Sequence, residues 1–103
     1  MEEIKDLSQF ETAAKDGKAI MYFTAGWCPD CWAIKPALPK IVENFPEYNF
    51  YTVNRDNLID LCRDLDIFGI PSFVAFDSGE EIGRLVNKDR KTQEEVESFI
   101  KSL

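Results

Sequence analysis

The segment Cys28-Pro29-Asp30-Cys31 lies where the sequence changes from one structural pattern to another. Before it, the short apolar run 19–24 has the length and composition of a buried strand. After it, apolar side chains recur at helical spacing, at Ile34, Leu38, Ile41, Val42 and Phe45. Pro29 suits the first turn of that helix, because its missing N–H would have no intrahelical partner there. A buried strand that leads into a helix indicates an α/β fold, with both cysteines at the helix start.

The rest of the chain also alternates between helical and strand patterns. Ser8 with Glu11, and Thr92 with Glu95, form capping boxes that predict two helix starts. Parallel strands joined through helices and followed by a hairpin form a three-layer α/β/α sandwich with a central mixed sheet. Besides the elements above, we expect helices at 8–15, at 57–66 and after 92, and strands at 50–53, 72–76 and 81–86.

Two prolines lie inside the helix that follows the cysteines. Pro36 lacks the N–H that an interior helical hydrogen bond needs, so we expect a kink there. Pro39 lies a little further on, and it predicts an interruption in addition to the bend. The helix should end before Pro46, because the residue preceding a proline disfavours the helical conformation.

Length and composition limit the classes of function. A chain of 103 residues with neither repeats nor a linker fits one domain, residues 1–103. A net charge of −7 disfavours nucleic acid as a partner, since phosphate binding needs clustered Lys and Arg. No apolar run approaches the roughly 20 residues that cross a bilayer, and the acidic N-terminus lacks the apolar run of a secretory signal. We therefore expect a cytoplasmic monomer that binds neither nucleic acid nor membranes.

Three cysteines and the absence of histidine narrow the chemistry further. Without histidine the chain has no mixed Cys/His zinc site, Cys–His nucleophile pair or Ser–His–Asp triad. Three cysteines cannot complete a four-thiolate metal site within one chain, and an odd number is unlike a disulfide scaffold. We expect no metal and no cofactor, which leaves the chemistry of thiols.

The spacing of Cys28 and Cys31 suits a reversible redox pair. At a helix start, free N–H groups and the helix dipole favour an anion, so the pKa of an exposed Cys28 should fall. Cys31 follows one turn later, close enough to attack a mixed disulfide formed by Cys28. The alternatives are half of a metal knuckle, which lacks a second ligand pair here, or two buried cysteines without chemistry. Cys62 lies on the apolar face of the predicted helix 57–66, where we expect burial; a regulatory thiol is the alternative.

The segment Trp27-Cys28-Pro29-Asp30-Cys31, taken together with Gly69-Ile70-Pro71-Ser72, resembles the thioredoxin family over nearly the whole chain. The resemblance implies that Cys28 is the nucleophile and Cys31 the resolving cysteine. It also implies that Pro71 follows a cis peptide bond and faces them. The backbone of Ile70 would pair with a substrate strand, and Trp27 would shield the disulfide within an apolar docking surface.

Several positions depart from the family's pattern. The family usually has Gly-Pro between the cysteines, whereas this chain has Pro29 and Asp30, as in thioredoxin-related proteins of narrower substrate range. We count both residues as part of the substrate-binding surface. The family's buried acid falls at Tyr22 and its paired lysine at Thr52, so both proton-handling groups are replaced. The segment before Ser8 is short, which predicts a reduced or missing first edge strand.

These features predict a protein-disulfide reductase, a thiol–disulfide oxidoreductase that acts on proteins or small molecules containing disulfides. By the same resemblance, a flavin-dependent disulfide reductase supplies its electrons. Two alternatives stay open: a donor dedicated to one partner enzyme, and a redox-dependent adaptor that uses the same surface for binding. Phe68 and Phe73 flank the proline segment; we expect Phe73 in the core, and Phe68 either there or on the docking surface.

Overall fold

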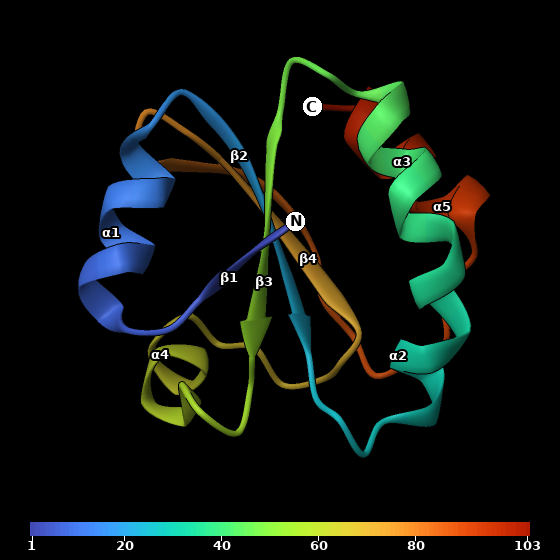
Figure 1. Ribbon diagram of the computed structural model, residues 1–103, viewed down its shortest axis with the longest axis horizontal. Coiled ribbons are helices and arrows are strands. Elements are labelled where there is room, and N and C mark those ends of the chain that lie inside the picture. Colours follow the sequence, from blue (N-terminus) through green and yellow to red (C-terminus); the bar gives the residue numbers. More distant parts are fainter.

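A five-stranded sheet forms the centre of the computed structural model, which describes all residues, 1–103 (Figure 1). The strands are β1 (Glu2–Ile4), β2 (Lys18–Thr24), β3 (Asn49–Asn54), β4 (Ser72–Asp77) and β5 (Glu80–Leu85). Their order across the sheet is β1-β3-β2-β4-β5. The first three of these run parallel, whereas β4 is antiparallel to β2, and β5 is antiparallel to β4. The sheet is therefore mixed, as the sequence predicts.

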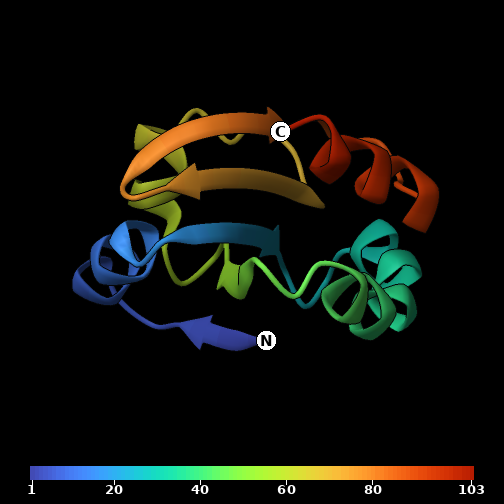
Figure 2. The same ribbon diagram turned by 90° about the horizontal axis from the view of Figure 1, so that it is seen from above.

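Helices cover both faces of this sheet (Figures 1 and 2). They are α1 (Leu7–Lys15), α2 (Pro29–Ile34), α3 (Leu38–Asn44), α4 (Ile59–Asp64) and α5 (Gln93–Lys101), with a 3₁₀ turn, η1 (Lys35–Ala37), between α2 and α3. Helices α1 and α4 lie on one face, and α2, α3 and α5 lie on the other. This arrangement confirms the predicted three-layer α/β/α sandwich. None of the helices combines the length and apolarity needed to cross a membrane.

The side chains of the central strand β2 point alternately to the two faces of the sheet and contribute to the hydrophobic core on each face. Ala19, Met21 and Phe23 pack in the cluster under α1 and α4, while Ile20 and Tyr22 pack in the cluster under α2, α3 and α5. All five are buried. Successive side chains of a strand point to opposite faces, so a strand covered on both sides reads as a continuous apolar run.

The two predicted capping boxes have different outcomes. Thr92 caps α5 as predicted, since its hydroxyl accepts the backbone N–H of Glu95 at 3.1 Å. The prediction for Ser8 is wrong, because α1 begins earlier and is capped by Asp6, whose carboxylate accepts the N–H of Gln9 at 2.8 Å. Aspartate is as good an N-cap as serine, and its earlier position allows Leu7 to open the helix.

The first edge strand is reduced but present, which corrects the element order expected from the sequence. β1 has three residues and pairs in parallel with Tyr51–Val53 of β3. Ile4 is buried there and contributes to the core, so one apolar side chain suffices to hold a short strand on the sheet edge. Helix α4 is shorter than the predicted 57–66, because Asn54 accepts the N–H groups of Asp56 and Asn57 and closes a turn instead.

The two internal prolines interrupt the helix after the cysteines, as predicted. α2 ends at Ile34, and Pro36 lies inside the 3₁₀ turn η1. Pro39 then occupies the first turn of α3, where its missing N–H is tolerated. The bend keeps Ile34, Leu38 and Ile41 buried against the sheet.

Candidate active site

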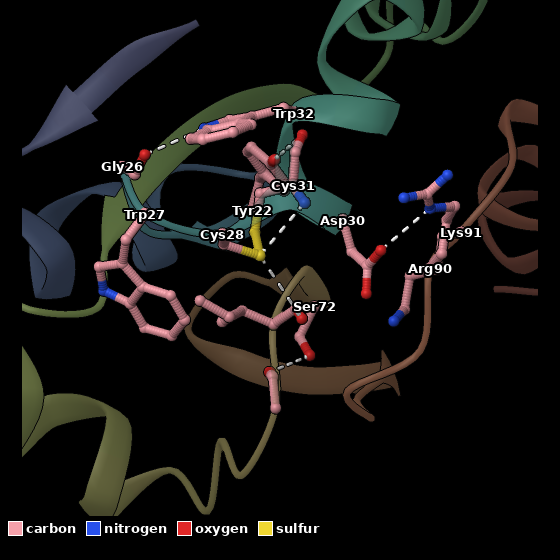
Figure 3. Close-up of a disulfide and its surroundings, with 12 residues drawn as sticks. Tyr22, Gly26, Trp27, Cys28, Asp30, Cys31, Trp32, Ser72, Arg90 and Lys91 are labelled. Carbon is pink, nitrogen blue, oxygen red and sulfur yellow. Dashed lines mark hydrogen bonds and ion pairs between the residues drawn. A yellow bond between two sulfur atoms is a disulfide. The ribbon is translucent and has the colours of Figure 1, made fainter.

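Cys28 and Cys31 form a disulfide at the start of α2, just after the chain leaves β2 (Figure 3). Cys28 is the N-cap residue of α2, with an extended backbone, and Pro29 begins the helix. The N–H of Cys31 points at the Cys28 sulfur, 3.2 Å away. The predicted position at the helix start is therefore confirmed. A thiolate at Cys28 would lie within reach of the Cys31 N–H, which also donates to the Cys28 carbonyl at 3.1 Å and can stabilise negative charge.

The expected exposure of Cys28 is wrong for the disulfide state. The residue is only 4% exposed, although Cys31 and Cys62 are each more buried at 1%. The Cys28 sulfur lies 3.9 Å from the carbonyl oxygen of Ile70, so the loop before β4 covers it. Local sequence patterns do not show this cover, because it comes from a residue 42 positions away; only the family resemblance places the proline segment opposite the cysteines.

The loop that faces the disulfide contains a cis peptide bond between Ile70 and Pro71, as the resemblance implies. The Ser72 hydroxyl donates to the carbonyl of Gly69 at 2.5 Å and lies 3.3 Å from the carbonyl of Asn87. Gly69 has no room for a side chain, since a Cβ there would lie 2.4 Å from the backbone nitrogen of Lys88. The proline loop is thus packed directly against the segment that follows β5.

Two exposed tryptophans, Trp27 and Trp32, lie near the disulfide (Figure 3). Trp27 is 56% exposed, and its indole N–H donates to Asp56 at 2.8 Å. Trp32 is exposed and donates to the carbonyl of Gly26 at 3.0 Å. Phe68 is 88% exposed, which places it on the surface and outside the core, whereas Phe73 is fully buried as expected. Anchored indoles with one free face suit contact with an apolar partner surface.

Asp30 makes an ion pair that no sequence pattern indicates. The Arg90 guanidinium Nε donates to the Asp30 carboxylate at 2.9 Å, which joins the start of α2 to the loop before α5 (Figure 3). The two residues are 60 positions apart, so only the fold brings them together. Arg90 and the neighbouring Lys91 are site residues that sequence reasoning missed. The dense run of charges at 87–91 is the signal that could have drawn attention to them.

A cavity of about 670 Å³ lies beside Cys31, on the side away from the proline loop. Tyr22 and Thr52 both line it, and they are paired neighbours on β2 and β3. The Tyr22 hydroxyl donates to the carbonyl of Cys31 at 3.3 Å. Burial raises the pKa of Tyr22 above its usual value, and the nearby Thr24 offsets this only in part. No carboxylate lines the cavity, so no acidic side chain there takes the place of Tyr22 beside Cys31.

Cys62 is a free cysteine buried in α4, as predicted. Burial raises the pKa of its thiol, and the positive charge of Arg55 opposes that rise only partly. A buried thiol that stays protonated is a poor nucleophile, so the structure gives Cys62 a packing role.

The disulfide follows the carboxyl end of the central strand β2, at the start of a helix, and the loop with the cis-proline faces it. This arrangement defines a thiol–disulfide oxidoreductase. The model of the thioredoxin family matches residues 3–102. Thioredoxin-1 of Saccharomyces cerevisiae is 31% identical over 85 residues, which cover 82% of this chain and 82% of that protein. An H-type thioredoxin of Fagopyrum esculentum is 35% identical over 79 residues, covering 76% and 68% respectively.

The solved structures agree with the sequence relatives. Oxidised mitochondrial thioredoxin 3 of Saccharomyces cerevisiae matches with a TM-score of 0.88 and 25% identity, over 100% of this chain and 95% of that one. A Malassezia sympodialis thioredoxin gives a TM-score of 0.85 and 26% identity, covering 98% and 90% respectively. The chain belongs to the thioredoxin family. It is a thioredoxin-type thiol–disulfide oxidoreductase whose redox pair is Cys28 and Cys31.

Proposed function

We propose that Cys28 is the attacking thiol and Cys31 the resolving thiol of a protein-disulfide reductase. The observation that carries this assignment is the position of Cys28 at the N-cap of α2, opposite Ile70. The Cys31 N–H points at the Cys28 sulfur, which favours the thiolate there. Cys31 is one turn further along and more buried.

The reaction proceeds in two exchanges. The Cys28 thiolate attacks one sulfur of the substrate disulfide, forming a mixed disulfide and releasing the other substrate sulfur as a thiolate, which takes up a proton. Cys31 then loses its proton and attacks the Cys28 sulfur. The intramolecular disulfide closes and the second substrate sulfur leaves as a thiolate. Two electrons pass from the protein to the substrate, and a reductase must return them.

The substrate backbone has a ready partner in Ile70. Neither the N–H nor the carbonyl of Ile70 makes a backbone hydrogen bond, so both can pair with an extended substrate segment. Pro71 orients this loop toward the cysteines. Trp27, Pro29 and Asp30 lie next to Cys28 in the chain and would contact side chains on either side of the substrate disulfide. Family membership implies disulfide substrates and a thioredoxin reductase. We propose that this reductase is flavin-dependent and that both proteins act in the cytoplasm as soluble partners.

Insulin reduction with a chemical reductant tests the assignment. Wild-type protein should accelerate precipitation of the insulin B chain, and Cys28→Ser should abolish the acceleration. Cys31→Ser should accumulate a stable mixed disulfide through Cys28, because the resolving thiol is missing. A mixed disulfide that forms through Cys31 in the Cys28→Ser variant at the wild-type rate would reverse the two roles.

A further inference from the structure

The loop after β5, residues 87–91, is folded around a buried ammonium group. Lys91 is only 3% exposed, and its Nζ donates to the Asn87 side-chain oxygen at 2.7 Å and to the Asp89 carbonyl at 2.6 Å. A third contact, at 3.3 Å, reaches the Asn87 carbonyl. The same Asn87 side-chain oxygen accepts the N–H of Asp89. Oxygens of the loop itself therefore satisfy the buried charge and fix the loop's shape.

This loop borders the redox site on the side of the proline segment. The Asn87 carbonyl accepts from the Ser72 hydroxyl, and the backbone of Lys88 passes directly over Gly69. A segment held against Gly69 and Ser72 lies beside Ile70, where we propose that the substrate backbone pairs. Side chains carried by the loop are thus within reach of the residues that flank a substrate disulfide.

Arg90 is held in place by one contact and keeps most of its donors free. Its Nε donates to Asp30, while neither Nη1 nor Nη2 has a partner in the protein. The side chain is 63% exposed. A guanidinium presents its terminal N–H groups in a fixed planar arrangement that matches a carboxylate. Asp30 therefore orients Arg90, and the free N–H groups of Arg90 can bind a second carboxylate close to the redox pair.

The charge of this loop is opposite to that of the molecule. The chain as a whole carries −7, but residues 87–91 hold Lys88, Arg90 and Lys91 against the single acid Asp89. The loop thus has a net charge of +2, counted from those four side chains. The overall charge favours basic partners, whereas this loop favours acidic groups right beside the redox pair.

We propose, on the basis of the proposed reductase function, that Arg90 is a specificity-determining residue that selects disulfides with a carboxylate next to the reactive cysteine. The contact is partly exposed, so the preference should be about 1.5-fold to fivefold in the second-order rate constant, the range that exposed charged pairs give. Screening by salt should weaken it.

The test uses three peptide disulfides that differ only at the residue beside the attacked cysteine, which is Asp, Gln or Lys. Second-order rate constants with the reduced protein are measured at low and high ionic strength. The wild-type protein should prefer Asp over Gln and Gln over Lys, and high salt should compress the series. Arg90→Gln should remove the preference for Asp, and Arg90→Lys should restore part of it.

Two control variants separate the direct contact from other electrostatic effects. Lys15→Gln makes the same change in net charge at the opposite end of the sheet, and it should leave the preference intact. Asp30→Asn should keep part of the preference for Asp, because the Arg90 charge remains while the ion pair that orients it is lost, and the double variant with Arg90→Gln should lose the preference. Retention of the preference in the double variant would mean that Arg90 only neutralises Asp30, which would overturn the inference.

Two results separate this inference from the function on which it rests. A wild-type protein that reduces all three peptides at equal rates would overturn the role of Arg90 alone. A protein that reduces none of them would overturn the proposed reductase roles, and with them this inference.

Discussion

Helices α2 and α4 each contain a buried cysteine and lie at the same end of the sheet, on opposite faces, yet only one of them supports thiol chemistry. Cys28 is the N-cap of α2, and its sulfur receives the N–H of Cys31. The N-cap of α4 is Leu58, which makes no side-chain capping bond, and Cys62 lies inside that helix within the core. The exposed fractions of Cys28 and Cys62 differ by only a few per cent. The two thiols therefore differ chiefly in position: a backbone N–H at a helix start points at the Cys28 sulfur, whereas burial inside α4 raises the pKa of Cys62.

The largest expected difference is between the alkylation rates of Cys28, at the start of α2, and Cys62, inside α4. In the reduced protein, iodoacetamide should modify Cys28 about a hundredfold faster than Cys62 near neutral pH, because the attacking species is the thiolate. The raised pKa of Cys62 keeps it protonated, so its labelling should increase only at alkaline pH. Mass mapping of the labelled peptides gives both rates in one experiment. Faster labelling of Cys62 would contradict the comparison outright.

The second expected effect concerns the two cysteines of α2. Resolution needs Cys31 as a thiolate, but no carboxylate lines the cavity beside it, and the raised pKa of Tyr22 prevents that residue from acting as a base at neutral pH. We expect the resolving step to limit turnover and to accelerate as pH rises. Tyr22→Asp should speed it roughly tenfold or more near neutral pH and flatten the pH dependence. Burying the carboxylate should cost about 2 kcal/mol or more of unfolding free energy.

Stopped-flow decay of a preformed Cys28 mixed disulfide, measured from mildly acidic to mildly alkaline pH, tests this expectation. Tyr22→Phe is the matched control, because it removes the hydroxyl without supplying a base, and it should leave the pH dependence in place. Decay of the wild-type mixed disulfide that is already fast and independent of pH would show that another group accepts the proton.

A smaller effect is expected at Cys62. Cys62→Ala removes a buried sulfur from the cluster under α1 and α4, which should lower the free energy of unfolding by about 1 kcal/mol. Insulin reduction should stay at the wild-type rate, since the thiol takes no part in exchange. Denaturant unfolding gives the first quantity, and Cys62→Ser should cost more because it buries a hydroxyl. Loss of reductase activity in the folded Cys62→Ala protein would instead favour a regulatory thiol.

The smallest expected effect comes from the residue between the cysteines. Asp30→Asn removes a negative charge near Cys28 and frees the positive charge of Arg90. Both changes favour the thiolate, so the midpoint of the Cys28 titration should fall by about half a unit. Thiolate absorbance of the reduced variant measures the shift. A rise of the midpoint would show that Asp30 acts on Cys28 through something other than its charge.

The sequence predicts features whose causes are local. The N-cap position of Cys28, the helix interruption caused by Pro36 and Pro39 together, and the cap at Thr92 each follow from residues a few positions apart, and the structure confirms all three. The start of α1 was misplaced because Asp6 and Ser8 are both competent caps, and local preference alone does not choose between them. The cover over Cys28 and the partner of Asp30 depend on long-range packing, which no spacing in the sequence encodes.

In the loop 87–91, some side chains stabilise the loop and others are available to a partner. The buried Lys91 ammonium, which is bound to Asn87, holds the loop together, while the side chains of Lys88 and Arg90 are exposed. Replacing an exposed side chain therefore changes the chemistry offered to a partner without dismantling the support beneath it. Single substitutions in such a loop can change substrate preference during evolution at little cost to folding. They do so near the cysteines without replacing a residue that contacts them. Mutation of Lys91, by contrast, would alter the presentation of every other side chain in the loop at once.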